Sequence, residues 1–410
     1  MPLTDLTDLD LMDSALYVAG VPHEHFAELR RTSPVSWHED PRGPGYWAVV
    51  THPECVAVNR DWQRFSSYLE TCLPMELPEG EREQQQLMMV NMDPPLHTRY
   101  RRLVNKGFTP RMVGALEQRI HEAADDIIDR VCERGEADFV TEVAAELPLI
   151  VIADLLGVPQ GDRHQMFEWS NRMIGNEDPE YLVNEAAPAE AAMELYAYAS
   201  ELYAKKREEP HGDLMSVLTE VEIDGERLSD LELELFFLML TVAGNETTRN
   251  LMSGAMQAFF DHPAEWDRLL ADRSLLPCAV EEMLRFVSPV MNFRRTATCD
   301  VELRGVTIRA GDKVVFYHAS ANRDEEVFSD SDTFDIGRDP NPHIAFGGGG
   351  PHFCLGANLA RMEIHVMYEH LLDRLPDLRP AGPPVRLRSQ FINGVKHLPV
   401  TFTPTTKLRG

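Results

Sequence analysis

A glycine-rich segment near the carboxyl end constrains this chain more than any other feature. Residues 345–361 read Ala-Phe-Gly-Gly-Gly-Gly-Pro-His-Phe-Cys-Leu-Gly-Ala-Asn-Leu-Ala-Arg and contain one cysteine, Cys354. A helical pattern begins directly after Cys354, so we expect its thiol near the positive end of a helix. That position lowers the pKa of a thiol and suits the sulfur to bind a metal.

The surroundings of Cys354 favour one kind of metal site. No second cysteine or close cysteine–histidine pair accompanies it, which argues against zinc. A haem iron needs a single sulfur ligand because the porphyrin supplies four other bonds, and glycines let a backbone pass close to that flat ring. A mobile loop with a free cysteine remains an alternative. A nucleotide-binding loop fits poorly, since His352 or Phe353 would fill the last glycine position of the dinucleotide motif.

The segment resembles the cysteine-ligand loop of the cytochrome P450 family, Phe-Gly-x-Gly-x-His-x-Cys-x-Gly. Phe346 stands eight positions before Cys354, one more than in the common pattern. A similar extra glycine is familiar from actinobacterial members that oxidise sterols and branched lipids. The resemblance implies that Cys354 is the axial ligand of haem b. It also implies contacts to the cofactor from Phe346, Gly348, Gly356, Ala360, Ala243 and Gly244.

A second pattern is a long helix with a polar middle. Ser229 and Glu232 form a capping box, and the apolar pattern behind it runs to about Phe260. The run is interrupted at 243–248, Ala-Gly-Asn-Glu-Thr-Thr, although buried polar groups cost free energy unless they are satisfied. The hydroxyl of Thr247 can bond to the carbonyl four residues earlier and loosen the helix. Gly244 has no side chain, so we expect another group to lie close to the helix backbone at this position.

Residues 243–248 resemble the oxygen-binding groove of the same family, Ala-Gly-x-Asp/Glu-Thr-Thr. By this resemblance Thr247 takes the place of the hydroxyl that steadies dioxygen, and Glu246 that of the acid feeding the proton relay. Splitting dioxygen requires two protons at its distal oxygen, which a hydroxyl backed by a carboxylate can deliver. The alternative is an ordinary polar turn on an exposed helix.

Two further sets of charged residues match the family. Glu282 and Arg285 share a helical face, which by itself indicates only a surface ion pair. They resemble the family's Glu-x-x-Arg element, and Arg338 matches the arginine that completes a buried network fixing the cysteine loop. Residues 93–101 resemble the family segment that holds the haem propionates, and this resemblance implies that His97, Arg101, Arg295 and His352 bind them. A lone histidine on a helix is usually only a surface residue.

The substrate is the part on which the sequence says least. By resemblance, the distal pocket is lined by apolar residues: Met88, Met89, Val90, Leu240, Ala243, Val290 and Phe391. They suit a steroid, terpenoid, fatty acid or polyketide, but core packing explains them equally well. The helices around Asp162–Asn176 and Ala189–Arg207 are expected to form a lid, with Gly175–Pro188 as a mobile connector.

Composition limits the partners. The net charge of −28 argues against nucleic acid and anionic membranes. Six scattered cysteines suggest reduced thiols in a cytoplasm, and the amino terminus lacks a secretion signal. The most apolar stretch, Leu235–Gly244, is too short to span a bilayer. We therefore expect a cytoplasmic monomer. Basic residues could form a patch for an acidic iron–sulfur donor or be scattered solvated charges: Arg99, Arg102, Lys106, Arg111 and Arg361.

The element pattern predicts a mainly α chain with a small β portion, an α+β fold. Expected strands are 35–38, 46–50, 301–308 and 313–317, with a polar surface loop at 66–86 and a hairpin at 390–400 turning at Asn393-Gly394. The resemblance implies the triangular haem-thiolate fold as one domain over 1–410. In it, 1–34 is a lead-in and no reductase is attached.

The implied function is a monooxygenase that inserts one atom of O2 into a C–H bond of an apolar small molecule, by hydroxylation or epoxidation. Electrons from NAD(P)H would arrive through a separate ferredoxin and ferredoxin reductase. A peroxide-driven haem peroxygenase and a non-oxygenating haem-thiolate sensor are the alternatives. The intact Glu246–Thr247 pair speaks against both.

Overall fold

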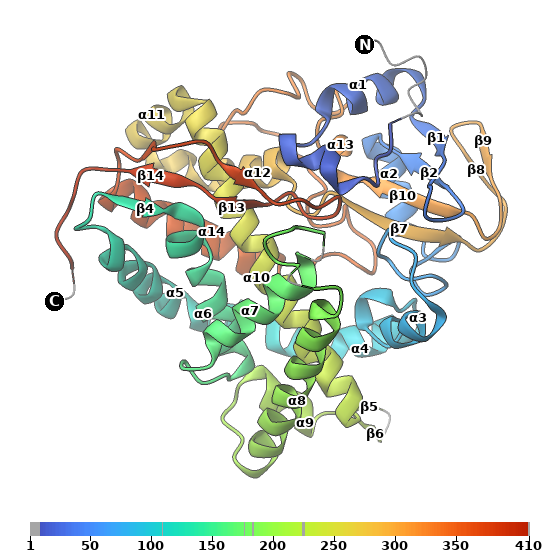
Figure 1. The fold of residues 1–410 in the computed structure, drawn as a ribbon, viewed down its shortest axis with the longest axis horizontal. Helices are drawn as coiled ribbons and strands as arrows, with labels where there is room; N and C mark the ends of the chain where they lie inside the picture. The colour runs from blue at the N-terminus through green and yellow to red at the C-terminus, as the bar shows by residue number, and fades with distance from the viewer. Residues whose placement is uncertain (1–8, 109, 176, 183, 224–225, 409–410) are drawn as a thin grey trace.

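Helices dominate the computed structural model, which describes residues 9–108, 110–175, 177–182, 184–223 and 226–408 (Figure 1). The α-helices are α1 (His23–Thr32), α2 (His52–Arg60), α3 (Glu79–Gln85), α4 (Leu96–Val104), α5 (Pro110–Val131), α6 (Glu146–Leu156), α7 (Arg163–Ile174), α8 (Ala187–Glu208), α9 (Leu214–Glu220), α10 (Asp230–Asp261), α11 (Pro263–Ala271), α12 (Leu276–Val287), α13 (His318–Ala321) and α14 (Ala357–Arg374). Shorter turns are the 3-10 helices η2 (Ser14–Ala19), η3 (Met89–Asn91), η4 (Asn105–Phe108) and η6 (Arg273–Leu275), and the π-helix η5 (Val140–Ala144).

The strands form small sheets beside the helical part. The largest has the order β1-β2-β10-β7-β3, in which β10 runs parallel to β2 and the other pairs are antiparallel. Its strands are β1 (Val35–His38), β2 (Tyr46–Val49), β3 (Phe65–Ser66), β7 (Asn292–Ala297) and β10 (Lys313–Tyr317). The others are β4 (Glu136–Asp138), β5 (Glu222–Ile223), β6 (Glu226–Arg227), β8 (Val301–Leu303), β9 (Val306–Ile308), β11 (Arg379–Pro380), β12 (Val385–Arg386), β13 (Val395–His397) and β14 (Pro399–Thr401). The predicted α+β class is confirmed.

The long helix α10 organises the core. It crosses the molecule from the β5–β6 hairpin towards α11, and it packs against α6, α8 and α12 (Figure 1). Both halves of the predicted capping box are present, because the side chain of Ser229 accepts from the Glu232 N–H and the Glu232 carboxylate accepts from the Ser229 N–H. Leu233, Phe237 and Met252 are fully buried along it. This helix and its start are confirmed.

Several expected elements differ from the structure. The supposed loop 66–86 contains α3, and the strands expected at 301–308 form a hairpin separate from β10. The hairpin turning at Asn393-Gly394 is wrong, because β13 pairs with β12 instead. The backbone N–H of Asn393 donates to the carbonyl of Pro289, and its side-chain Nδ2 donates to the carbonyl of Val287. These distant carbonyls hold the residue that the local pattern assigned to a turn.

Candidate active site

The loop that carries Cys354 is a tight turn built by glycine. The N–H of Gly347 donates to the carbonyl of Ile344 at 2.8 Å, and that of Cys354 donates to Phe346 at 3.0 Å. The four glycines between them all have positive φ angles, from +64° to +99°. L-residues with a side chain rarely adopt this conformation, so the run of glycine is a backbone requirement.

Helix α2 supplies the surface on which this loop rests. Arg60 Nε donates to the carbonyl of Gly348 at 2.8 Å, and Asn59 Nδ2 donates to Gly349 at 3.1 Å and also to Gly347. A Cβ at Gly348 would lie 3.1 Å from side-chain carbons of Val56 and Ile344. At Gly348 there is therefore a close approach to neighbouring side chains of the protein.

Asn59 was missed by the sequence analysis, and the structure joins it to a predicted residue. Arg295 Nη2 donates to Asn59 Oδ1 at 2.8 Å, so one side chain links Arg295 to the glycine carbonyls. The glycine run itself indicates that its backbone carbonyls need hydrogen-bond donors from another segment. Nothing in the sequence indicates which residue, almost three hundred positions away, supplies them.

Cys354 is accessible and still surrounded by protein. Its residue is exposed, yet burial of the sulfur raises the pKa of the thiol. The N–H of Gly356 and the charges of Arg101 and Arg361 act in the opposite direction and are outweighed. The expectation of a lowered pKa is therefore wrong, because desolvation exceeds the effect of the helix end.

The four residues expected at the propionates lie together. The rings of His97 and His352 are 4.3 Å apart between centroids, and Arg101 and Arg295 act on the pKa of both. Burial, with these cations, lowers the pKa of His97 to about 4 and that of His352 well below its ordinary value. Both histidines are therefore neutral at pH 7.

This cluster fits an anionic group. His97 Nδ1 is buried and has no hydrogen-bond partner among the described residues. Arg295 is 3% exposed, and burial lowers its pKa because a charged guanidinium is desolvated there. Two guanidiniums and an unpaired ring nitrogen would gain from carboxylates such as the haem propionates.

The polar middle of α10 lies as the pattern indicates. Thr247 Oγ1 donates to the carbonyl of Ala243 at 2.6 Å, the bond expected from the spacing, and the helix continues without a break. Ala243 is exposed and Thr247 is partly exposed, so both face away from the packed core. Gly244 does not: a Cβ there would lie 3.0 Å from Ile152 of α6. The close approach at Gly244 is between two helices.

Glu246 is buried beside a cation that the sequence analysis overlooked. Its Oε2 pairs with Arg249 Nη2, one helical turn later, and both residues are at most 3% exposed. Burial raises the pKa of this carboxyl, while the charge and hydrogen bond of Arg249 lower it, as does the nearby amide of Asn250, which donates to the backbone carbonyl of Glu246 at 2.9 Å. The signal that could have found Arg249 was a charged residue three positions after Glu246 in an otherwise buried helix.

The predicted ionic network is assembled behind the loop. Arg285 binds both oxygens of Glu282 at 2.8 Å, and Arg338 Nε lies 3.2 Å from Glu282 Oε2. The remaining donors of Arg285 reach the carbonyls of Asn322, Ser331 and Thr333. These bonds tie α12 to the segment that leads into the cysteine loop.

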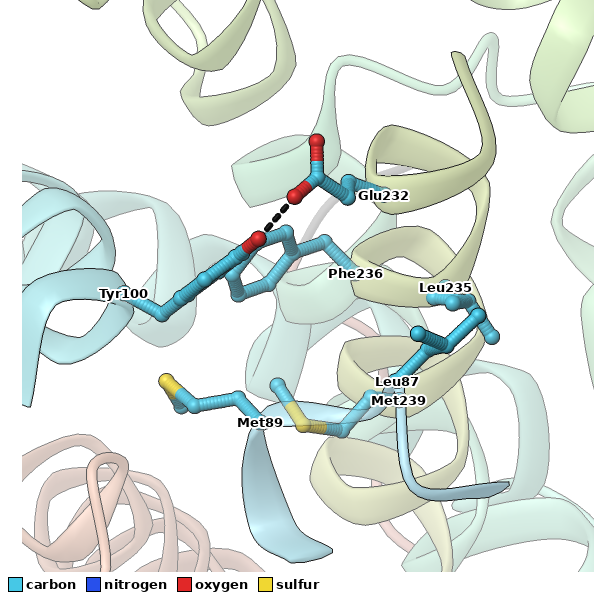
Figure 2. A pocket seen from close by; sticks show the side chains of 7 residues that line it. All are labelled: Leu87, Met89, Tyr100, Glu232, Leu235, Phe236 and Met239. Carbon is cyan, nitrogen blue, oxygen red and sulfur yellow. Dashed lines mark hydrogen bonds between the residues drawn. The ribbon is translucent and has the colours of Figure 1, made fainter. Parts of the chain in front are cut away.

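A recess between α4 and α10 includes one of the expected pocket residues. Figure 2 shows it lined by Leu87, Met89, Tyr100, Glu232, Leu235, Phe236 and Met239. The hydroxyl of Tyr100 points to Glu232 and donates to its Oε1, while Oε2 of the same carboxylate accepts from the Ser229 N–H at 2.7 Å. Met88 and Leu240 are buried in the large core cluster, and Val90 packs against it. Val290 pairs with Ile392, and the ring of Phe391 lies 5.5 Å from that of Phe293.

The connector between α7 and α8 is held by ion pairs in its described part. Lys396 of β13 lies 2.8 Å from Asp178 Oδ1 and 2.7 Å from Glu180 Oε2. His397 binds Glu180 at 3.1 Å and Asp138 at 2.6 Å. These contacts fasten the connector to the carboxyl-terminal sheet.

The structure also bears on the basic patch, on other metal sites and on membrane-spanning helices. Of the basic residues considered for a patch, Arg361 pairs with Glu281 at 2.6 Å, and the side chains of Lys106 and Arg111 lie outside the described ones. Among described residues, no three His, Cys, Asp or Glu gather in a metal-binding group. The described helices include none with the length and apolarity needed to cross a membrane.

Comparison with known proteins agrees with this geometry. The cytochrome P450 family model matches residues 43–376. A steroid C26-monooxygenase of Mycolicibacterium smegmatis is 43% identical, over 99% of this chain and 97% of that protein. A methyl-branched lipid omega-hydroxylase of Mycobacterium bovis is 40% identical, over 98% and 96%. The crystal structure of a Mycobacterium marinum cytochrome P450 with pseudoionone superposes with a TM-score of 0.91 at 39% identity, covering 98% of this chain and all of that one.

These matches span nearly the whole chain, and the family uses haem and O2 with electrons from redox partners. The chain therefore belongs to the cytochrome P450 family and is a monooxygenase.

Proposed function

We propose that this enzyme hydroxylates a terminal carbon on the branched side chain of a steroid or a methyl-branched lipid. The names of the two relatives support this substrate class, since one is a steroid C26-monooxygenase and the other a methyl-branched lipid omega-hydroxylase. The single observation that carries the oxygenase site is the exposed residue Cys354 beside the cluster of His97, Arg101, Arg295 and His352. The proposed enzyme is one domain, with electrons from a separate ferredoxin and its reductase.

Cys354 would ligate the haem iron, and the cationic cluster would hold the propionates. When bound, haem supplies the iron at which O2 is reduced and one oxygen atom is transferred to the C–H bond. The overall reaction consumes O2, two electrons and two protons, and yields the alcohol and water. The chain itself must therefore bring two protons to the site from solvent.

Thr247 and Glu246 are the residues that would handle these protons. In the structure the Thr247 hydroxyl donates its proton to the Ala243 carbonyl, so its lone pairs are free to accept a hydrogen bond. Glu246 is the buried acid next to it and can pass protons as general acid. Glu282, Arg285 and Arg338 would act by holding the cysteine loop.

The test is purified, haem-loaded protein with a panel of steroids, branched lipids and straight-chain fatty acids. We expect the reduced carbonyl adduct to show the red-shifted band of a thiolate complex, which Cys354→Ser abolishes and Cys299→Ser, at another exposed cysteine, leaves intact. Branched substrates should shift the haem spin state and give terminal alcohols by mass spectrometry. Oxidation of only straight chains, or turnover with peroxide and none with a ferredoxin system, would contradict the proposal.

Thr247→Ala should keep NAD(P)H consumption and divert oxygen to hydrogen peroxide, because the hydroxyl that takes part in the proposed proton relay is lost. Product and peroxide per NAD(P)H measure this coupling. Unchanged coupling would remove Thr247 from the proposed relay.

A further inference from the structure

The two oxygens of the Glu246 carboxyl have different surroundings. Oε2 is paired with Arg249 Nη2, whereas Oε1 is buried and has no hydrogen-bond partner among the residues that the structure describes. A carboxyl oxygen that accepts from a guanidinium is a poor place for a proton. When Glu246 is neutral, its proton therefore sits on Oε1.

Helix α7 fixes the cation that creates this difference. Arg249 Nη1 donates to Asn171 Oδ1 at 2.8 Å, and the guanidinium lies 5.3 Å from the centre of the Phe167 ring. Phe167 and Asn171 are four positions apart on α7 and so present one face to α10. Arg249 is 3% exposed, so water does not compete for its donors.

We propose that Arg249 is a positioning residue for proton delivery and that Asn171 of α7 holds it in place. It keeps Oε2 of Glu246 occupied and leaves Oε1 as the one oxygen that releases a proton and takes the next. After release, the carboxylate is left beside a guanidinium that stabilises its charge. This inference rests on the proposed role of Glu246 as the acid.

Arg249 also sets how readily the acid ionises. Burial alone would keep the carboxyl neutral, and Arg249 opposes that effect. Tyr181, in the connector after α7, is a titratable group near this pair, because both Glu246 and Arg249 act on its pKa, as do Glu180 and Lys396. Without Arg249, Glu246 would hold its proton and relay would slow.

The experiment compares variants around the pair in the haem-loaded enzyme. Arg249→Met and Asn171→Leu should lower product per NAD(P)H about tenfold, within the range that general acid catalysis contributes, and enlarge the solvent isotope effect on turnover. Arg249→Lys keeps a cationic donor and Asn171→Asp keeps an acceptor, so both variants should retain most of the product formed per NAD(P)H. Arg172→Met is the matched control, because Arg172 is the next residue of α7 but pairs with Glu194.

Infrared spectroscopy gives a readout independent of turnover. The band of a protonated carboxyl, assigned by its loss in Glu246→Gln, should grow at pH 7 in Arg249→Met and stay unchanged in Arg172→Met. Asn171→Leu leaves the ion pair itself, so it tests the proposal even if Arg249→Met fails to fold. If Glu246→Gln leaves coupling unchanged, the proposed acid is wrong. If it uncouples the enzyme while Arg249→Met and Asn171→Leu do not, only the positioning role is overturned.

Discussion

Glu282→Gln tests whether the buried ionic network stabilises the fold that holds Cys354. The side chain of Glu282 is fully buried, as is that of Arg285, and the side chain of Arg338 is 8% exposed. The Glu282 carboxylate also accepts from Asn341 Nδ2 at 3.1 Å and from the Asp335 N–H at 2.9 Å. Every neighbour is thus a donor. A glutamine would present an amide N–H to one of these donors and leave two buried guanidiniums without an anion.

The expected cost follows from that geometry. Breaking a buried pair by removing one partner costs about 3–5 kcal/mol, because the remaining charge is uncompensated. Folded proteins are stable by only about 5–15 kcal/mol, so the loss is a large part of the total. Urea unfolding followed by tryptophan fluorescence should show a midpoint lower by roughly 0.5–1 M, because the slope of the unfolding free energy in urea is several kcal/mol/M for a chain of this size.

Glu326→Gln is the matched control for this substitution. Glu326 lies 3.4 Å from Arg304, and its side chain is 68% exposed. Exposed pairs contribute about 0–1 kcal/mol, so its midpoint should hardly move. If Glu282→Gln costs less than about 1 kcal/mol, the network does not stabilise the loop as argued.

Three further outcomes are expected. Gly350→Ala should lower the thermal midpoint more than Gly305→Ala does: the φ angles are +82° and +78°, but only at Gly350 would the Cβ meet backbone, 3.1 Å from Arg60 Cα. Equal losses would mean that strain alone, about 1–2 kcal/mol, decides. Desolvation lowers the pKa of His397, but hydrogen bonds and charges of Asp138 and Glu180 outweigh it and raise the pKa above 6.5. The contribution of charged His397 to the stability of the connector is therefore full below pH 6.5 and is lost as the pH rises through the raised pKa. Hydrogen exchange of residues 177–182 should become faster over that pH range. His397→Gln should abolish this pH dependence. Burial raises the pKa of Glu363 well above 4.5, so just above pH 4.5 this carboxyl ionises in the unfolded chain and stays neutral in the folded one. Glu363→Gln should therefore stabilise the fold by up to about 1.4 kcal/mol for each pH unit above 4.5. Urea titrations measure this gain, and a gain that does not depend on pH would refute the reasoning.

The sequence predicts those features whose causes are local. The start of α10 is written in Ser229 and Glu232, and the bond from Thr247 to Ala243 follows from a spacing of four. The cationic cluster was reached by resemblance, and the structure brings its members together. In the first two cases one short motif contains both partners, whereas the cluster joins residues of three separate segments.

What could not be predicted depends on contacts between distant segments. Asn59 supports the glycine loop only because α2 lies beneath it, and Gly244 faces Ile152 only because α6 crosses there. The raised pKa of Cys354 likewise reflects how much protein surrounds the sulfur, which no motif states. Asn171 reaches Arg249 from another helix. Such neighbours are set by packing and not by spacing.

Glu232 spans two helices, since one oxygen caps α10 and the other binds Tyr100 of α4. Tyr100 stands between His97 and Arg101 in sequence, and Thr247 lies fifteen residues along α10 from Glu232. An axial slip of α10 by one residue would move Thr247 about 1.5 Å relative to α4. The Glu232 carboxylate thus fixes the axial position of α10 relative to α4. It thereby fixes the distance from the Thr247 hydroxyl to the cluster that contains His97 and Arg101.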